Sequence, residues 1–361
     1  MTVLVFLVSL LGAMALGMPI AISLLVCGVA LMLHLGMFDA QILAQNLIGG
    51  ADSFPLMAVP FFMLAGELMN AGGLSKRIIA FAMALVGHVR GGLGYVAVVA
   101  ARALAGAALG ERPLAALENA LRECLADTAA LAALLIPMMR QAGYRLDRSC
   151  GLIAAGGIIA PVIPPSIGFV VFGVAAGVSI TRLFLAGIVP GLLMGLALVI
   201  TWYVLAKDEP VSPLPRPSVR SIAKAAFDGL WALLLPFVII GGMKLGVFTP
   251  TEAAVVAAVY AFVIGMFVYR ELRIEHLRPA LLAALKMSAS VMFLVAAALV
   301  SAWLITIANI PAEVGAMLGP LIEYKTLLMA AMMLLVVVVG TALDFIPTVL
   351  ILTPVLMPIV K

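Results

Sequence analysis

The sequence predicts an all-α polytopic membrane protein. Of its 361 residues, 65% are hydrophobic and 11% are charged, and the mean hydropathy is +1.26. Soluble domains hold only about 45–50% apolar residues, so one soluble core could not bury this composition. Several apolar runs reach the roughly 20 residues that a membrane-spanning helix requires. Three prolines between Gly156 and Ser166 further predict a broken helix at membrane depth.

The same sequence argues against an enzyme, a cofactor site and a nucleic-acid binder. It holds no Ser/His pair, His-Glu-x-x-His run or close aspartate dyad that could carry out catalysis. Cys27, Cys124 and Cys150 are too scattered for a disulfide framework or a metal site. No basic run alternates with aromatic residues, so nucleic acid is not an expected partner. The expected environment is a lipid bilayer.

The first apolar run, Val3 to Leu33, lacks the basic start of a removed signal peptide, and we interpret it as a retained first span. Its Gly17, Pro19 and Gly28 predict a bent or two-piece helix.

A second run, Ser53 to Met69, contains Glu67, which is interpreted as an interfacial anchor. Asn70 to Gly73 is a helix-stop signal. Ser75 is expected to cap the following helix, Lys76 to Val86, which is too short to span and is amphipathic.

The linker and loops in the second half predict topology. Lys207 to Asp228 is rich in proline and basic residues, and Arg270 to Arg278 is again basic. Basic loops lie on the cytoplasmic side, so Leu230 to Val247 and Glu252 to Tyr269 are expected to cross out and back. Thr249 is expected to open the second of these helices through a capping box.

The proline break is the most informative stretch. Pro161, Pro164 and Pro165 lack backbone N–H groups, which leaves upstream carbonyls without helical donors. Ser166 is expected to cap a new helix, Ile167 to Ala176, whose positive dipole end points into the break. Such breaks coordinate cations in secondary transporters, although a proline-kinked span or a tight loop is the simpler alternative.

An internal repeat supports the transporter interpretation. Asp127 and Asp344 each lead an apolar run in which a proline follows ten residues later, at Pro137 and Pro354. Ionisable residues inside membranes are rare and are candidate functional groups. The simpler alternative for both aspartates is a helix N-cap, and a chance match of two apolar runs is also open.

The chain resembles the large membrane subunit of the tripartite ATP-independent periplasmic (TRAP) transporters, the C4-dicarboxylate permease type. The similarity runs in order through nearly the whole chain, and the branch it resembles most is that of the sugar-acid (2,3-diketogulonate) permeases. The matching segments are residues 53–70, 87–93, 126–131, 156–166, 184–191, 248–254 and 350–354.

The resemblance implies an inverted-repeat, elevator-type secondary transporter with re-entrant helical hairpins in the bacterial inner membrane. It implies that Na⁺ is the coupling ion and that an organic acid, a dicarboxylate or a sugar acid, is imported. It also implies two protein partners, a small TRAP membrane subunit and a periplasmic substrate-binding protein.

The resemblance further assigns site residues. Backbone carbonyls of Ala160, Val162 and Pro165 are expected to bind Na⁺, with Asp127 and Thr128 beside them. Hard cations prefer oxygen ligands, and unwound backbone supplies them. The substrate side and the second repeat are assigned to a further set, Pro161, Pro164, Ser166, Asp344 and Thr348.

The sequence departs from the family pattern in two places. A charged stretch, 111–124, stands where similar proteins have a Ser-Gly-Ser run, which indicates either a frame error or a divergent loop. Relatives also continue beyond Lys361 into a second proline break. The alternative function is therefore a truncated or degenerate scaffold that binds the small subunit without transporting.

We expect five regions along the chain. They are N-terminal spans and an interfacial helix (1–110), a first hairpin and proline-break repeat (111–206, with 111–124 atypical), a cytoplasmic loop (207–228), second-half scaffold spans (229–325), and an incomplete second transport repeat (326–361).

Overall fold

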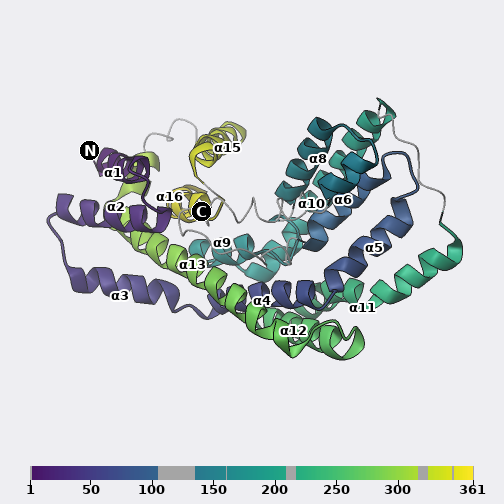
Figure 1. Ribbon diagram of the computed structural model, residues 1–361. Helices are drawn as coiled ribbons and strands as arrows, with labels where there is room; N and C mark the ends of the chain where they lie inside the picture. Colours follow the sequence, from purple (N-terminus) through teal and green to yellow (C-terminus); the bar gives the residue numbers. More distant parts are fainter. Residues whose placement is uncertain are drawn as a thin grey trace.

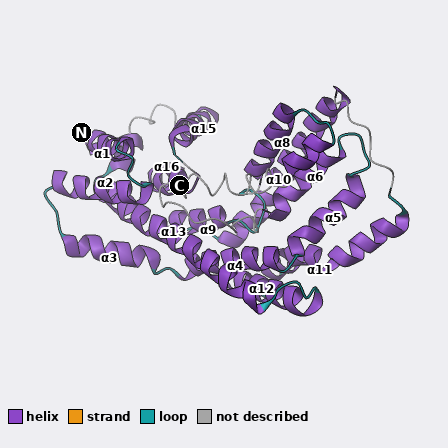
Figure 2. Ribbon diagram, viewed as in Figure 1, coloured by secondary structure: helices purple, strands orange, loops and turns teal. Residues whose placement is uncertain are grey.

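The computed structural model describes residues 2–104, 135–159, 161–208, 217–315, 324–343 and 345–360, and within these ranges the chain is helical and contains no strand (Figures 1 and 2). The α-helices are α1 (Thr2–Ala15), α2 (Ile20–His34), α3 (Ala40–Ala51), α4 (Ala58–Ala71), α5 (Leu74–Val86), α6 (Gly92–Leu104), α8 (Leu146–Ile159), α9 (Ile167–Ala176), α10 (Ile180–Leu205), α11 (Val219–Lys244), α12 (Pro250–Val263), α13 (Ile274–Ile307), α15 (Lys325–Ala342) and α16 (Phe345–Val360). The short helices η1 (Phe54–Met57), η2 (Ala206–Asp208) and η3 (Ile264–Val268) and helical residues 135–141 and 310–315 complete the described fold.

Among the described residues, five helical segments are long and apolar enough to cross a membrane. They are Phe54–Ala71, Ile180–Leu205, Val219–Lys244, Pro250–Val268 and Ile274–Ile307. Together with the hydropathy of the chain, these segments confirm the predicted all-α membrane protein.

The first apolar run forms two helices that lie side by side, α1 and α2 (Figure 1). Gly17 takes a left-handed φ of 79°, and Pro19 precedes the first residue of α2, so the chain reverses between them. Cys27 Sγ donates to the carbonyl of Phe6 at 3.5 Å, which ties the two helices together. The two-piece helix is confirmed, whereas the single span from Val3 to Leu33 is wrong because the second piece folds back.

Helix α13 is the longest element, with 34 residues, and it packs against α2, α3, α4 and α16 (Figure 1). Helix α4 packs along α12 through small residues. A Cβ on Gly72 would lie 2.9 Å from the Cα of Gly265, so the two backbones approach as closely as glycine permits.

Helices α11 and α12 form the predicted out-and-back pair. The hydroxyl of Tyr260 donates to the carbonyl of Trp231 at 2.7 Å, and that of Tyr269 donates to the carbonyl of Asp228 at 2.8 Å. The end of α12 therefore lies beside the first half of α11, and the two basic loops meet at one end of the pair. The capping box that opens α12 is also confirmed, since Thr249 Oγ1 accepts from Glu252 N and Glu252 Oε2 accepts from Thr249 N.

Helix α5 begins two residues earlier than predicted. Its N-cap is Gly73, with a left-handed φ of 74°, and Ser75 lies inside the first turn, where it is buried. The capping role predicted for Ser75 is wrong, because Gly73 takes the cap position. Few residues other than glycine adopt a positive φ at low cost.

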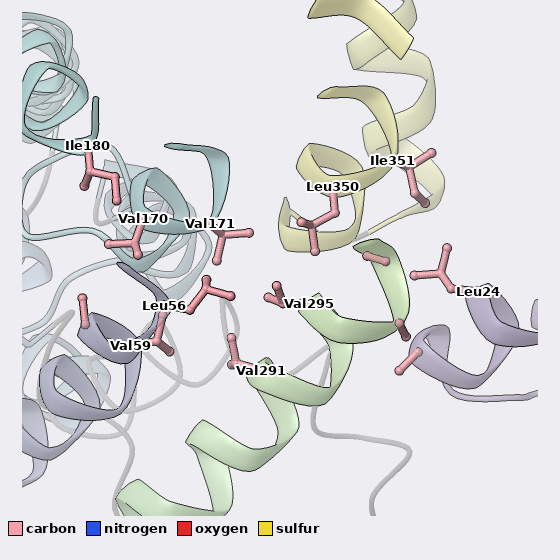
Figure 3. Packing of buried hydrophobic residues seen from close by; sticks show 14 of the residues in the cluster. Leu24, Leu56, Val59, Val170, Val171, Ile180, Val291, Val295, Leu350 and Ile351 are labelled. Carbon is pink, nitrogen blue, oxygen red and sulfur yellow. The ribbon is translucent and has the colours of Figure 1, made fainter. Parts of the chain in front are cut away.

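Two large, separate hydrophobic cores hold most of the described helices, and two smaller clusters lie around Leu74 and Leu68. The first core gathers apolar residues of α1, α2, α4, α9, the start of α10, α11, α12, α13 and α16. Figure 3 shows part of it, with Leu350 of α16 and Val171 of α9 facing Val295 of α13 and Leu56. The second core gathers residues of α6, α8, helical residues 135–141 and the end of α10 around the buried side chain of Trp202. Helix α10 is thus shared by both cores.

Candidate functional site

The helix break predicted from the prolines is present. Helix α8 ends at Ile159, residues 161–165 are non-helical, and α9 begins at Ile167, as predicted. The Pro164–Pro165 peptide is cis. Ala160, one of the expected Na⁺ ligands, lies outside the described residues, whereas Val162 and Pro165 lie in the break.

Local hydrogen bonds give the break a defined shape. The amides of Val162 and Ile163 both donate to the carbonyl of Ile159, at 3.1 and 3.3 Å. The hydroxyl of Ser166 donates to the carbonyl of Pro161 at 2.5 Å and accepts from the amide of Phe169 at 3.4 Å. Ser166 is therefore the predicted N-cap of α9, and it also satisfies the Pro161 carbonyl, for which the sequence predicted no helical donor.

The break rests on helix α10. The carbonyl oxygen of Val162 lies 2.5 Å from the position that a Cβ on Gly187 would occupy, and the side chain of Ile163 fills the corresponding space at Gly191. Pro190 lies between these two glycines inside α10. The break and α10 are thus in direct contact through positions without side chains.

The second half of the chain meets the first half at this place. Helix α9 packs against α16, and the ring of Phe345, the first residue of α16, occupies the space of a Cβ on Gly168. The starts of α9 and α16 therefore lie together. Because each helix N-terminus carries a partial positive charge, both can attract an anion here.

Thr348 lies one turn into α16. Its side chain is buried, with 7% exposed, and its hydroxyl donates to the carbonyl of Leu343 at 3.4 Å. The neighbouring Asp344 lies outside the described residues, as do Asp127 and Thr128 of the first half. The structure thus places Thr348 on α16, the helix that packs against α9, while the expected roles of the three other residues stay predictions.

The possible cation ligands among the described residues around the break are oxygen atoms. They comprise the carbonyls of the unwound backbone, the hydroxyl of Ser166 and, on α16, the hydroxyl of Thr348. Within the described ranges, no group of three or more His, Cys, Asp or Glu side chains could hold a metal ion. Neutral oxygen atoms of this kind are ligands that hard cations prefer.

Glu67 is more deeply buried than the sequence analysis predicted. Its side chain is 5% exposed, and its Oε1 has no hydrogen-bond partner among the described residues. An interfacial anchor would keep its carboxylate in water, so that interpretation is wrong. The rarity of carboxylates inside an apolar run was the signal that should have marked it as buried.

Two arginines that the sequence places in charged loops also form hydrogen bonds between distant segments of the chain. Arg90 Nη2 donates to the carbonyl of Lys207 at 2.9 Å, and Arg148 Nη1 donates to that of Leu205 at 2.8 Å. Both carbonyls lie at the C-terminal end of α10, where the helix leaves carbonyls unpaired and attracts cations. The end of α10 is thus fixed to the segments that precede α6 and begin α8.

Comparison with known proteins identifies the family. Residues 7–361 match the family described as "Tripartite ATP-independent periplasmic transporter, DctM component". The chain belongs to the DctM family. It is 54% identical over all 361 residues to a putative TRAP transporter large permease protein of Haemophilus influenzae, and covers 82% of that protein.

Other DctM relatives carry more specific names. The chain is 53% identical to the 2,3-diketo-L-gulonate TRAP transporter large permease protein of Escherichia coli, over the whole chain and 82% of that protein. It is 35% identical over 97% of its length to the sialic acid TRAP transporter large permease protein of Vibrio cholerae, covering 79% of that protein. These relatives are named as permeases rather than enzymes. As a DctM permease, the chain is a multi-pass protein of the bacterial inner membrane.

Proposed function

We propose that the chain is the large permease subunit of a Na⁺-coupled TRAP importer that moves an organic acid. The observation that supports this most is the convergence of the proline break with the start of α16. Unwound carbonyls there suit a cation, and two helix N-termini suit a carboxylate. Binding both ligands at one junction would link their movement.

The relatives support an organic anion as substrate. Several of their names specify 2,3-diketo-L-gulonate, sialic acid or C4-dicarboxylates, which bear carboxylates, and one specifies isethionate, which bears a sulfonate. The higher identity to the 2,3-diketo-L-gulonate permease favours a sugar acid. A small membrane subunit and a periplasmic binding protein complete the proposed system, with transport by elevator-type movement of inverted repeats.

Uptake by the reconstituted system tests this function. The chain would be purified with its small subunit, placed in proteoliposomes and supplied with the binding protein and radiolabelled 2,3-diketo-L-gulonate. We expect uptake under an inward Na⁺ gradient and at most background uptake when K⁺ replaces Na⁺. Na⁺-independent uptake would contradict the coupling. Co-purification with the small subunit and no uptake of any organic acid would favour the non-transporting scaffold.

A further inference from the structure

The contact between the break and α10 depends on the positions of the glycines along α10. Gly187, Gly191 and Gly195 recur every four residues, so they lie along one face of the helix. A Cβ on Gly187 or Gly191 would collide with the break, whereas a Cβ on Gly195 would meet nothing within 4 Å. Two of the three glycines therefore lie where the break packs against α10.

The two contacts differ in kind. At Gly191 the neighbour is the side chain of Ile163, which is stiff at χ1 because it is β-branched and can therefore move aside only in part. At Gly187 the neighbours are the ring of Phe169 and the backbone carbonyl of Val162. That carbonyl belongs to a segment whose prolines fix φ and whose amides are bonded to Ile159, so it cannot rotate away alone.

Helix α10 also packs against α4 and α9. Phe184, one turn before Gly187, is 1% exposed. Its ring centroid lies 6.4 Å from that of Phe62 on α4 and 6.3 Å from that of Phe169 on α9. These contacts keep α10 from moving away from the break, so extra volume at position 187 must displace the Phe169 ring, the Val162 carbonyl or both.

We propose that Gly187 is a positioning residue for the cation site, because it sets the place of the Val162 carbonyl. The proposal rests on the proposed function, in which this carbonyl binds Na⁺. A methyl group at position 187 moves the oxygen from its site and weakens Na⁺ binding. Substrate uptake then requires more Na⁺.

Substitutions along one helix test the proposal. In proteoliposomes, Gly187→Ala should raise the Na⁺ concentration for half-maximal uptake at least tenfold. Gly195→Ala is the matched control, since it makes the same glycine-to-alanine change in the same helix without a collision, and it should stay within twofold of wild type. An equal shift in both variants, or no shift in a folded Gly187→Ala protein, would overturn the proposal.

A second measurement separates a cation effect from a general packing defect. Purified protein would be heated in NaCl and in KCl, and the Na⁺-dependent rise in Tm should be lost in Gly187→Ala but kept in Gly195→Ala. The double variant Gly187→Ala/Phe169→Leu relieves the ring contact only. If it regains wild-type Na⁺ dependence, the ring rather than the carbonyl is responsible, and the proposal fails.

A further pair remains decisive if Gly187→Ala does not fold. Gly191→Ala pushes the break through Ile163 and should raise the half-maximal Na⁺ concentration about threefold, and adding Ile163→Ala should reverse this. An unshifted Gly191→Ala would then overturn the proposal. A wild-type protein without any Na⁺ dependence would instead contradict the proposed function, so the two failures are distinguishable.

Discussion

At the scale of single residues, hydroxyl and glycine positions define the break more than its prolines do. The prolines predict that the helix must stop, and Ser166 was correctly predicted to begin the next helix. The bond from Ser166 to the Pro161 carbonyl could not be predicted, because it depends on how the five-residue break folds back. The burial of Glu67 likewise depends on neighbours from distant helices.

Replacing Ser166 should therefore cost more than losing an ordinary cap. Ser166→Ala removes the cap of α9, about 1 kcal/mol, and leaves the Pro161 carbonyl without its donor, about another 1 kcal/mol or more. Thermal unfolding in detergent measures the loss. Ser179→Ala is the control, since Ser179 caps α10 through the amide of Arg182 but is exposed. Equal losses in both variants would argue against the second role of Ser166.

At the scale of elements, several helix ends were predicted correctly, whereas most of the contacts between helices were not. The start of α9, the stop of α4 and the capping box of α12 follow from local chemistry that the sequence displays. That α1 turns back onto α2 depends on their packing. The junction of α5 with the end of α12 depends on Arg77, which bonds Glu271 at 2.8 Å and lies 3.7 Å from the ring centroid of Tyr269.

The planar guanidinium of Arg77 should be required at this junction. Arg77→Lys keeps the charge but loses the stacked geometry over Tyr269 and the bond from Nη1 to the Gly73 carbonyl, so we expect a loss of about 1 kcal/mol. Arg273→Lys is the control, because the Arg273–Glu275 pair is exposed and 4.0 Å long. Chemical unfolding that affects both variants equally would contradict this role.

At the scale of the molecule, the membrane class was predictable and the two cores were not. Apolar runs predict spans because the bilayer requires them, and the out-and-back pair of α11 and α12 follows from the positions of the basic loops. Hydropathy does not tell which apolar faces pack together, since lipid and protein interiors are similarly apolar. The contact between α9 and α16 was not predicted from the sequence.

The second core should depend on Trp202. Its indole donates to the carbonyl of Gly91 at 2.8 Å, and its ring stacks on Tyr144 with centroids 6.1 Å apart. Trp202→Phe should cost about 2–3 kcal/mol and speed amide exchange in α6 and α8 more than in α2 and α13. Trp231→Phe, at a side chain that is partly exposed, is the control. Uniform exchange across all four helices would contradict the independence of the cores.

The division into two cores also has a consequence for biosynthesis. The described residues of the second core all lie between Ile79 and Ala206, whereas the first core joins Phe6 to Leu356. A ribosome adds residues from the N-terminus, so the second core can close while α11 to α16 are still unmade. The first core must wait for α16, the same helix that brings the second half to the proline break. The junction proposed to bind the ion and the acid is therefore assembled after the second core can form.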